Sequence, residues 1–187
     1  MAASSREPVA AVTGGAGGIG EACVARLRAQ GWQVVVLDRN MDLAREVAAR
    51  HGAIAREIDL ADTASIDAAA AWVEREVGPC SALAAVAAHL ENPHMPEKQD
   101  EAEWDAILRV NLTGTFRTLT AFGAGMLERG QGSIVTVGSI TAFNSSPLQA
   151  YGPTKAAIIN MSRNFAVAWG RRGVRVNCAC PGPTRTP

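Results

Sequence analysis

Short apolar segments alternate with helical segments six times along the 187 residues, and this order restricts the fold more than composition does. The apolar segments are hydrophobic throughout instead of at every second position, which indicates strands buried on both faces of a sheet. We therefore expect an α/β fold, a doubly wound parallel sheet in three layers (α/β/α), forming one domain over residues 1–187. The expected strands are residues 8–14, 32–38, 53–60, 81–87, 132–138 and 174–180.

Glycine, capping residues and polar segments mark the boundaries of the helices between these strands. Asn111, Thr113 and Gly114 interrupt the middle of the longest helix and predict a local irregularity there. Residues 89–99 and 139–150 are polar or proline-containing and are expected to be loops. The expected helices are residues 17–31, 41–52, 62–78, 101–130 and 151–172.

The charges of the chain balance, with 18 Lys and Arg against 18 Asp and Glu. Such a chain has no overall basic field for a nucleic acid or an anionic membrane, so neither is expected as a partner. No apolar stretch approaches the ~20 residues that span a bilayer, and the N-terminus lacks the apolar core of a secretion signal. We expect a cytoplasmic protein.

The cysteines and histidines do not have the spacing of metal ligands. Cys178 and Cys180 fall in an expected strand, and we expect their side chains on opposite faces of the sheet, where they could not share a metal or a disulfide. His51, His89 and His94 show no ligand spacing with cysteines or carboxylates. The sequence therefore predicts no metal site.

A glycine-rich segment, TGGAGGIG at residues 13–20, follows the first expected strand and opens the first helix. Glycines let the backbone turn sharply and approach a pyrophosphate, and the helix N-terminus offers amide groups to it. A glycine cluster can also serve any tight strand-to-helix turn, but here the strand and the helix stand where a dinucleotide site requires them. The expected contacts are Gly14, Gly18, Ile19 and Gly20.

The second expected strand ends at Asp38, 18 residues after Gly20. A carboxylate there can accept hydrogen bonds from the adenosine ribose hydroxyls and repels a 2′-phosphate. Arg39 beside it could instead pair with a phosphate. On the strength of Asp38 we expect NAD as the cofactor in preference to NADP.

Tyr151 and Lys155 are four residues apart, which places a phenol and an ammonium on the same side of a helix. A tyrosine with its ordinary pKa of about 10 is a poor base at neutral pH, but a nearby cation favours the phenolate. We expect Lys155 to lower the pKa of Tyr151 and the pair to transfer a proton. A helix can also carry such a pair by coincidence.

Together these motifs resemble those of the short-chain dehydrogenase/reductases, a family of NAD(P)-dependent oxidoreductases with a Rossmann-like fold. The resemblance runs from about Pro8 to Pro187. It includes the glycine-rich segment, Asp59-Leu60, Asn111, Ser139, the Tyr151/Lys155 pair and the PGPTRT sequence at 181–186. It implies transfer of a hydride between NAD(H) and a small-molecule alcohol or ketone.

The resemblance also implies individual roles. Tyr151 would be the general acid or base, Ser139 would hydrogen-bond the substrate oxygen, and Lys155 would bind the nicotinamide ribose. Asn111 would hold a water that links Lys155 to solvent. Asp59 and Leu60 would contact the adenine. The residues expected to flank the nicotinamide are Pro181, Gly182, Thr184 and Thr186. Each of these residues also has a structural interpretation: Ser139 can cap a loop, Asn111 can satisfy backbone groups at a helix break, and Pro181-Gly182 can be an ordinary strand exit.

The chain departs from the family after the fourth strand, where Ala85-Val86-Ala87-Ala88 replaces the usual Asn-Asn-Ala-Gly. Family members continue beyond the position of Pro187 into a substrate-covering loop, further helices and a seventh strand. A protein that ends at residue 187 is therefore expected to lack these C-terminal elements and to be inactive or unstable.

By the same resemblance, small residues on the two long helices would pack against a second subunit in a homodimer or homotetramer. These residues are Ala121, Gly123, Gly125, Ala156, Ala157 and Ala166. Two alternative functions stay open: a non-catalytic NAD-binding protein, and a sugar-nucleotide epimerase-like enzyme, which shares the tyrosine–lysine pair.

Overall fold

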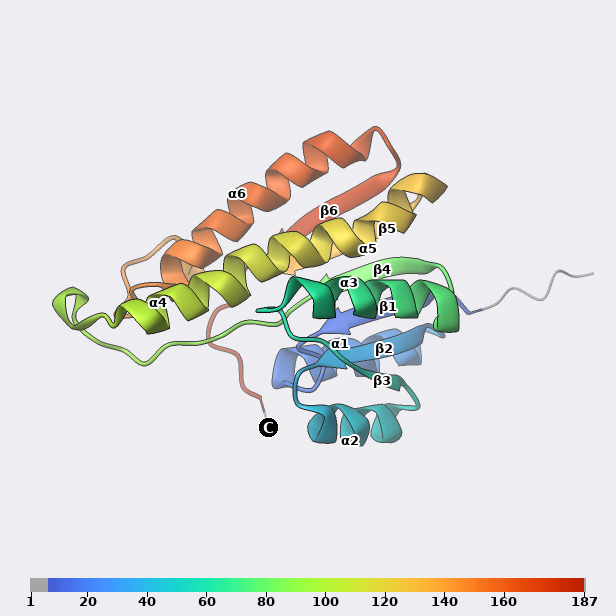
Figure 1. The fold of residues 1–187 in the computed structure, drawn as a ribbon, viewed down its shortest axis with the longest axis horizontal. Helices are drawn as coiled ribbons and strands as arrows, with labels where there is room; N and C mark the ends of the chain where they lie inside the picture. Colours follow the sequence, from blue (N-terminus) through green and yellow to red (C-terminus); the bar gives the residue numbers. More distant parts are fainter. Residues whose placement is uncertain (1–6, 187) are drawn as a thin grey trace, which may run out of the picture.

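A six-stranded parallel sheet forms the centre of the protein in the computed structural model, which describes residues 7–186 (Figure 1). Its strand order is β3-β2-β1-β4-β5-β6, so the order reverses between β1 and β4. The predicted doubly wound parallel sheet is confirmed. The strands are β1 (Val9–Thr13), β2 (Gln33–Asp38), β3 (Ile54–Glu57), β4 (Cys80–Ala85), β5 (Gly132–Val137) and β6 (Val174–Ala179).

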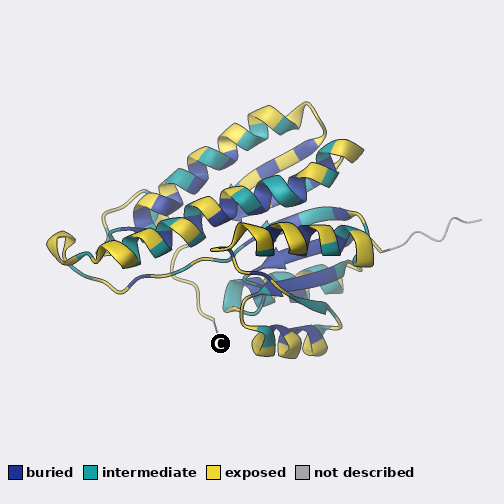
Figure 2. Ribbon diagram, in the orientation of Figure 1, coloured by how far each residue is buried: buried dark blue, intermediate teal, exposed yellow. Residues whose placement is uncertain are grey.

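Helices cover both faces of this sheet, because successive residues of each strand point to opposite sides. Val9 and Ala11 of β1 pack into one hydrophobic core, and Ala10 and Val12 pack into the other. The strands are accordingly the most continuously buried part of the molecule (Figure 2). The first core includes side chains of α3 (Thr63–Trp72), α5 (Thr115–Arg129) and α6 (Tyr151–Gly170), and the second those of α1 (Gly18–Ala29) and α2 (Met41–His51).

The predicted irregularity of the long helix is a π-helical segment. It runs from Leu108 to Gly114 and joins α4 (Glu101–Ile107) to α5 without a break in the helical path. A Cβ on Gly114 would overlap the carbonyl oxygen of Leu60. The π-helical segment can therefore approach the backbone at Leu60 this closely only because residue 114 is glycine. The widened turn carries Asn111, whose side chain is fully buried.

Three other short helical segments lie where the sequence indicated loops or a longer helix. The π-helical segment Val73–Val77 ends the helix that begins at Thr63, and Gly78 follows with a φ of 139°. Single 3₁₀ turns occur at Pro96–Lys98 and Ile140–Ala142, inside the two predicted loops. Such local hydrogen-bonded turns have weak sequence signals.

Gly123, one of the small residues expected at a subunit interface, has a packing role within the chain. It is buried, and a Cβ there would lie 2.6 Å from the Trp169 ring of α6. Trp169 in turn stacks edge-on with Phe165, with ring centroids 4.4 Å apart. Glycine at 123 therefore allows α5 and α6 to pack against each other.

Candidate dinucleotide and substrate site

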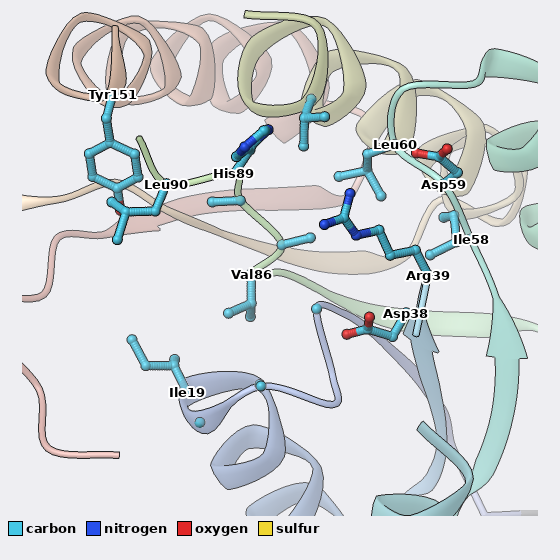
Figure 3. A pocket seen from close by; sticks show the side chains of 17 residues that line it. Ile19, Asp38, Arg39, Ile58, Asp59, Leu60, Val86, His89, Leu90 and Tyr151 are labelled. Atoms are coloured by element: carbon cyan, nitrogen blue, oxygen red, sulfur yellow. The ribbon is translucent and has the colours of Figure 1, made fainter. Parts of the chain in front are cut away.

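A pocket of about 530 Å³ opens at the carboxyl ends of the strands, beside the reversal of strand order between β1 and β4 (Figure 3). Parallel sheets of this kind bind ligands at this position. Eight of the predicted site residues line the pocket: Gly14, Gly18, Ile19, Gly20, Asp38, Asp59, Leu60 and Tyr151.

The glycine-rich turn forms the floor of the pocket. Gly14 has a φ of 64°, and a Cβ there would lie 2.7 Å from the Ala87 Cα atom. A Cβ on Gly20 would overlap the carbonyl oxygen of Gly14. The turn leads into α1, whose N-cap residue, Gly17, provides no side-chain hydrogen bond to the first helical amides. A tight turn without Cβ atoms and a helix N-terminus without a side-chain cap fit a pyrophosphate.

The Asp38 carboxylate is held at the end of β2 by two backbone amides. Its Oδ2 accepts a hydrogen bond from the Ala16 N–H at 3.2 Å, and its Oδ1 accepts one from the Asn40 N–H at 3.0 Å. Figure 3 shows this carboxylate and the Arg39 guanidinium at the edge of the same pocket. The fixed carboxylate is positioned to accept further hydrogen bonds from a ligand.

Asp59 and Leu60 lie just after β3, the strand that pairs with β2, and line the pocket on the same side as Asp38 and Arg39 (Figure 3). The Asp59 N–H donates to Ser65 Oγ at 2.9 Å, and the Asp59 carboxylate accepts from the Ala61 N–H at 2.8 Å. These bonds fix the turn so that the buried Leu60 side chain contributes an apolar surface to the pocket. An apolar wall between polar groups suits a flat aromatic base.

Tyr151, Ser139 and Lys155 come together where β5 ends and α6 begins. Burial raises the pKa of Tyr151 above its ordinary value of 10.0, and the neighbouring Ser139 hydroxyl lowers it in part. Any lowering of the Tyr151 pKa by Lys155 is smaller than the effect of burial, because the net shift is upward. The Lys155 Nζ lies 5.3 Å from the centroid of the Tyr151 ring and donates its hydrogen bond to the Val137 carbonyl at 2.8 Å.

Lys155 is itself strongly affected by its surroundings. Only 2% of the residue is exposed, and burial lowers the pKa of its ammonium to about 8. An amine whose pKa lies so close to neutral pH can exchange a proton where an ordinary lysine could not. Lys155 lies beside the pocket and does not line it.

Asn111 binds the backbone of the segment that follows β4. Its Oδ1 accepts from the His89 N–H at 2.6 Å, and its Nδ2 donates to the His89 carbonyl at 2.9 Å. The same Nδ2 lies 3.4 Å from the Thr154 hydroxyl of α6. The Asn111 side chain therefore satisfies backbone groups, as its structural interpretation expected, but these belong to His89 in the segment after β4 and not to the helix itself.

The segment 181–186 lies beside the pocket and does not line it in the described structure. The Pro181 carbonyl accepts from the Ile140 N–H at 3.1 Å, which fixes this segment next to Ser139. The Thr184 hydroxyl donates to the Gly182 carbonyl at 3.0 Å. Thr186 packs against Gly18, so the segment crosses from the catalytic candidates to the glycine-rich turn.

Several pocket residues were not predicted from the sequence. They share no ligand-binding residue type, and three of them, Val86, Ala87 and Ala88, follow β4, the strand next to β1 across the reversal of order. The residues for which no site role was predicted are Gly17, Ile58, Val86, Ala87, Ala88 and Val110. Arg39, considered as a partner for a phosphate, and His89 and Leu90, in the loop expected to shape the substrate pocket, also line it. The position of residues 86–90 after the fourth strand was the available signal, because the carboxyl ends of adjacent parallel strands share one edge.

The expected arrangement of Cys178 and Cys180 is wrong. Residues two apart in a strand point to the same face, and both sulfur atoms lie within 3.2 Å of where a Cβ on Gly138 would stand. All four cysteines are free. Within residues 7–186, no three His, Cys, Asp or Glu side chains are grouped as metal ligands, and no helix has the length and apolarity to cross a bilayer.

The fold and the pocket define a dinucleotide-binding α/β protein. The short chain dehydrogenase family model matches residues 8–187, and the chain belongs to this family of oxidoreductases, which includes dehydrogenases that act on alcohols. It is 38% identical to 2-(S)-hydroxypropyl-CoM dehydrogenase 3 of Xanthobacter autotrophicus, over 95% of this chain and 71% of that protein.

Two solved structures from Brucella melitensis have the same fold. One, described as ribose-5-phosphate isomerase, is 40% identical with a TM-score of 0.94, over 99% of this chain and 73% of that one. The other, a 3-ketoacyl-(acyl-carrier-protein) reductase complexed with NADH, is 27% identical with a TM-score of 0.93, over 98% of this chain and 78% of that one. Because different activities are named on one fold, the reaction of this chain must be argued from its side chains.

Proposed function

We propose that this protein is an NAD-dependent dehydrogenase that interconverts a small-molecule alcohol and the corresponding carbonyl compound. The observation that carries the proposal is the convergence of Tyr151, Ser139 and Lys155 beside a pocket that fits a dinucleotide. A protein that only binds a dinucleotide needs the glycine-rich turn and Asp38. It does not need a phenol, a hydroxyl and a buried amine close together, whereas a proton-transfer site does.

Tyr151 is the residue that exchanges a proton with the substrate oxygen. The Ser139 hydroxyl lowers the pKa of Tyr151 by hydrogen bonding to it. With substrate bound, its single hydrogen is donated to the substrate oxygen instead. The Lys155 ammonium, 5.3 Å from the centroid of the Tyr151 ring, favours the phenolate while it is protonated, although burial outweighs this effect. A bound nicotinamide supplies hydride transfer, and the protein supplies alignment of the reacting groups.

Asp38 supports the choice of NAD. Its carboxylate is fixed by the Ala16 and Asn40 amides, so it cannot turn away from a 2′-phosphate without losing both hydrogen bonds. Ribose hydroxyls can donate to it, whereas a phosphate dianion beside it would be repelled. Lys155, Asp59, Leu60 and the segment 181–186 are proposed to complete the cofactor contacts.

We also propose that the protein forms a homodimer or homotetramer through α5 and α6. Phe116 on α5 and Val167 on α6 are 43% and 81% exposed, and large apolar side chains on two adjacent helices favour a subunit contact.

Replacement of Tyr151 by Phe tests the proposed reaction. The purified protein is incubated with NAD or NADP and a panel of secondary alcohols, and reduction of the cofactor is followed by absorbance. We expect Tyr151→Phe to lower turnover by about 10²- to 10⁴-fold, the usual contribution of a general acid–base group, with NAD affinity unchanged. A variant that turns over normally would overturn the proposal, and a wild-type protein that binds NAD but reduces none with any alcohol would favour the non-catalytic alternative.

A further inference from the structure

We propose that Glu91 is a positioning residue that sets the place of Tyr151 by capping the N-terminus of α6 from a distant loop. The inference rests on the proposed role of Tyr151. Glu91 lies in the loop 89–99 and is 2% exposed, an unusual location for a carboxylate without a cationic partner. No ion pair of Glu91 is found in the part of the chain that the structure describes.

At the start of α6 the Gly152 N–H donates to the nearby Leu148 carbonyl at 3.3 Å, whereas the Ala150 and Tyr151 N–H groups donate to a side chain from another part of the chain. A helix leaves its first backbone N–H groups without intrahelical partners, and a side chain at the N-cap usually accepts from one of them. The N-cap residue of α6 is Ala150, which has no side-chain acceptor. The missing cap at the very residue that precedes Tyr151 must therefore be supplied from elsewhere.

Glu91 supplies it, although it is 60 residues from Tyr151 in the sequence. Its Oε1 accepts from the Ala150 N–H at 2.9 Å and from the Tyr151 N–H at 3.1 Å, and its Oε2 lies 3.1 Å from the Ala150 nitrogen. The partial positive charge of a helix N-terminus stabilises the carboxylate that these bonds hold. The backbone nitrogen of Tyr151 is thus fixed directly by the carboxylate.

These bonds close a ring that also includes Asn111. The Asn111 amide holds the His89 backbone on both sides, two residues before Glu91. The Thr154 hydroxyl lies 3.4 Å from Asn111 Nδ2 and donates to the Tyr151 carbonyl at 2.7 Å. The first turn of α6 is therefore held at the Tyr151 N–H by Glu91 and at the Tyr151 C=O by Thr154. Both connections lead to Asn111 in the π-helical segment. Removal of Glu91 opens the ring at its charged link.

The ring also couples Tyr151 to the wall of the pocket. Leu90, next to Glu91, lines the pocket. Further along the same loop, the His94 N–H donates to the Pro147 carbonyl at 3.2 Å, and the Gln149 side-chain amide donates to the His94 carbonyl at 3.0 Å. The loop that borders the pocket and the segment that leads into α6 are therefore joined at several points, of which Glu91 is the one that bonds Tyr151 directly.

The test compares three variants of the purified protein: Glu91→Ala, Glu91→Gln and the control Glu97→Ala. Gln keeps an oxygen at the Oε1 position, where two of the three contacts are made, and Glu97 is an exposed carboxylate of the same loop. Hydrogen exchange of the peptide that contains residues 150–154 is measured together with NAD affinity and with kcat and KM for the best alcohol of the panel.

We expect Glu91→Ala to increase exchange at residues 150–151 at least tenfold while the core strands keep their protection. It should lower kcat by roughly 10- to 100-fold, the cost of a misplaced reacting group, with little change in NAD affinity. Glu91→Gln should keep most of the protection at residues 150–151 and most of the wild-type kcat, and Glu97→Ala should behave as wild type in both measurements.

Unchanged exchange and unchanged kcat in Glu91→Ala would overturn the inference, as would a uniform loss of protection across the whole protein in both Glu91 variants. The exchange measurement does not depend on turnover. If the wild-type protein oxidises no alcohol, the proposed function fails while local exchange still decides whether Glu91 holds the start of α6.

Discussion

The Lys155 ammonium donates its hydrogen bond to the Val137 carbonyl at 2.8 Å, at the point where strand β5 ends before Ser139. This bond joins α6 to the sheet through a side chain that is almost fully buried. Burial lowers the pKa of Lys155 from its ordinary 10.5 to about 8. The stability of the protein must then depend on pH in a defined window.

Between pH 8 and 10.5 the unfolded chain keeps a proton on Lys155 that the folded protein has released. The unfolded state binds more protons there, so the free energy of unfolding rises with pH through this window. The gain attributable to Lys155 is on the order of 3 kcal/mol. We expect Lys155→Met to lose this rise and to lose turnover.

Urea unfolding of the wild type and of Lys155→Met, at pH values below 8 and up to 10.5, measures this difference. Titration of groups distant from Lys155 occurs in both proteins and cancels in the comparison, whereas Cys180, whose pKa is raised by burial and lowered in part by the charge of Lys155, contributes to the difference. Lys98→Met, at an exposed lysine in the loop 89–99, is the control and should follow the wild type. Parallel curves for the wild type and Lys155→Met would show that Lys155 keeps its ordinary pKa.

The sequence predicted the parts of the fold that depend on local pattern. The continuously apolar strands indicated a parallel sheet, and Asn111, Thr113 and Gly114 located the π-helical segment. It did not predict contacts between side chains and distant backbone, because these depend on how the elements pack. The Val137 carbonyl as the partner of Lys155 and the capping of α6 by Glu91 are both of this kind.

The candidate site shows the same division. The glycine-rich turn and Asp38 were predicted because each carries a local signal for its chemistry. The wall after β4 was missed because its apolar residues gain their place only from the neighbouring β1. The upward effect of burial on the Tyr151 pKa was not predicted, because the spacing to Lys155 says nothing about the burial of the phenol.

Tyr151 is the single tyrosine of the chain, so its titration can be observed directly. The ultraviolet absorbance of tyrosinate in the protein without cofactor should reach its midpoint above 10.0, because burial disfavours the phenolate. Ser139→Ala should move the midpoint higher still, since the Ser139 hydroxyl lowers this pKa. Ser145→Ala, at an exposed serine of the same loop, is the control. A wild-type midpoint below 10.0 would mean that Lys155 outweighs burial.

Asp38→Ser should change the preference between the two cofactors. Loss of the carboxylate removes hydrogen bonds to the ribose hydroxyls and the repulsion of a 2′-phosphate, while Arg39 stays at the edge of the pocket. We expect the ratio of kcat/KM for NAD over NADP to fall by roughly 10- to 100-fold, as loss of charge-assisted hydrogen bonds would cause. Asp42→Ser on α2 removes an exposed carboxylate that does not line the pocket and should leave the ratio unchanged.

Gly14→Ala should destabilise the protein before any cofactor is added. The φ of 64° disfavours a side chain, and the new methyl group would lie 2.7 Å from Ala87 Cα and 2.8 Å from Ala87 N. Strain and overpacking together should lower the free energy of unfolding by at least ~2 kcal/mol. Because both contacts are with backbone, Ala87→Gly should fail to rescue the variant. Gly17→Ala is the control, since a Cβ there meets its nearest atom, the Gly14 carbonyl oxygen, only at 3.7 Å. Equal urea midpoints for Gly14→Ala and Gly17→Ala would show that the segment after β4 can move away from the glycine-rich turn. The close approach of Ala87 would then not be the reason for glycine at position 14.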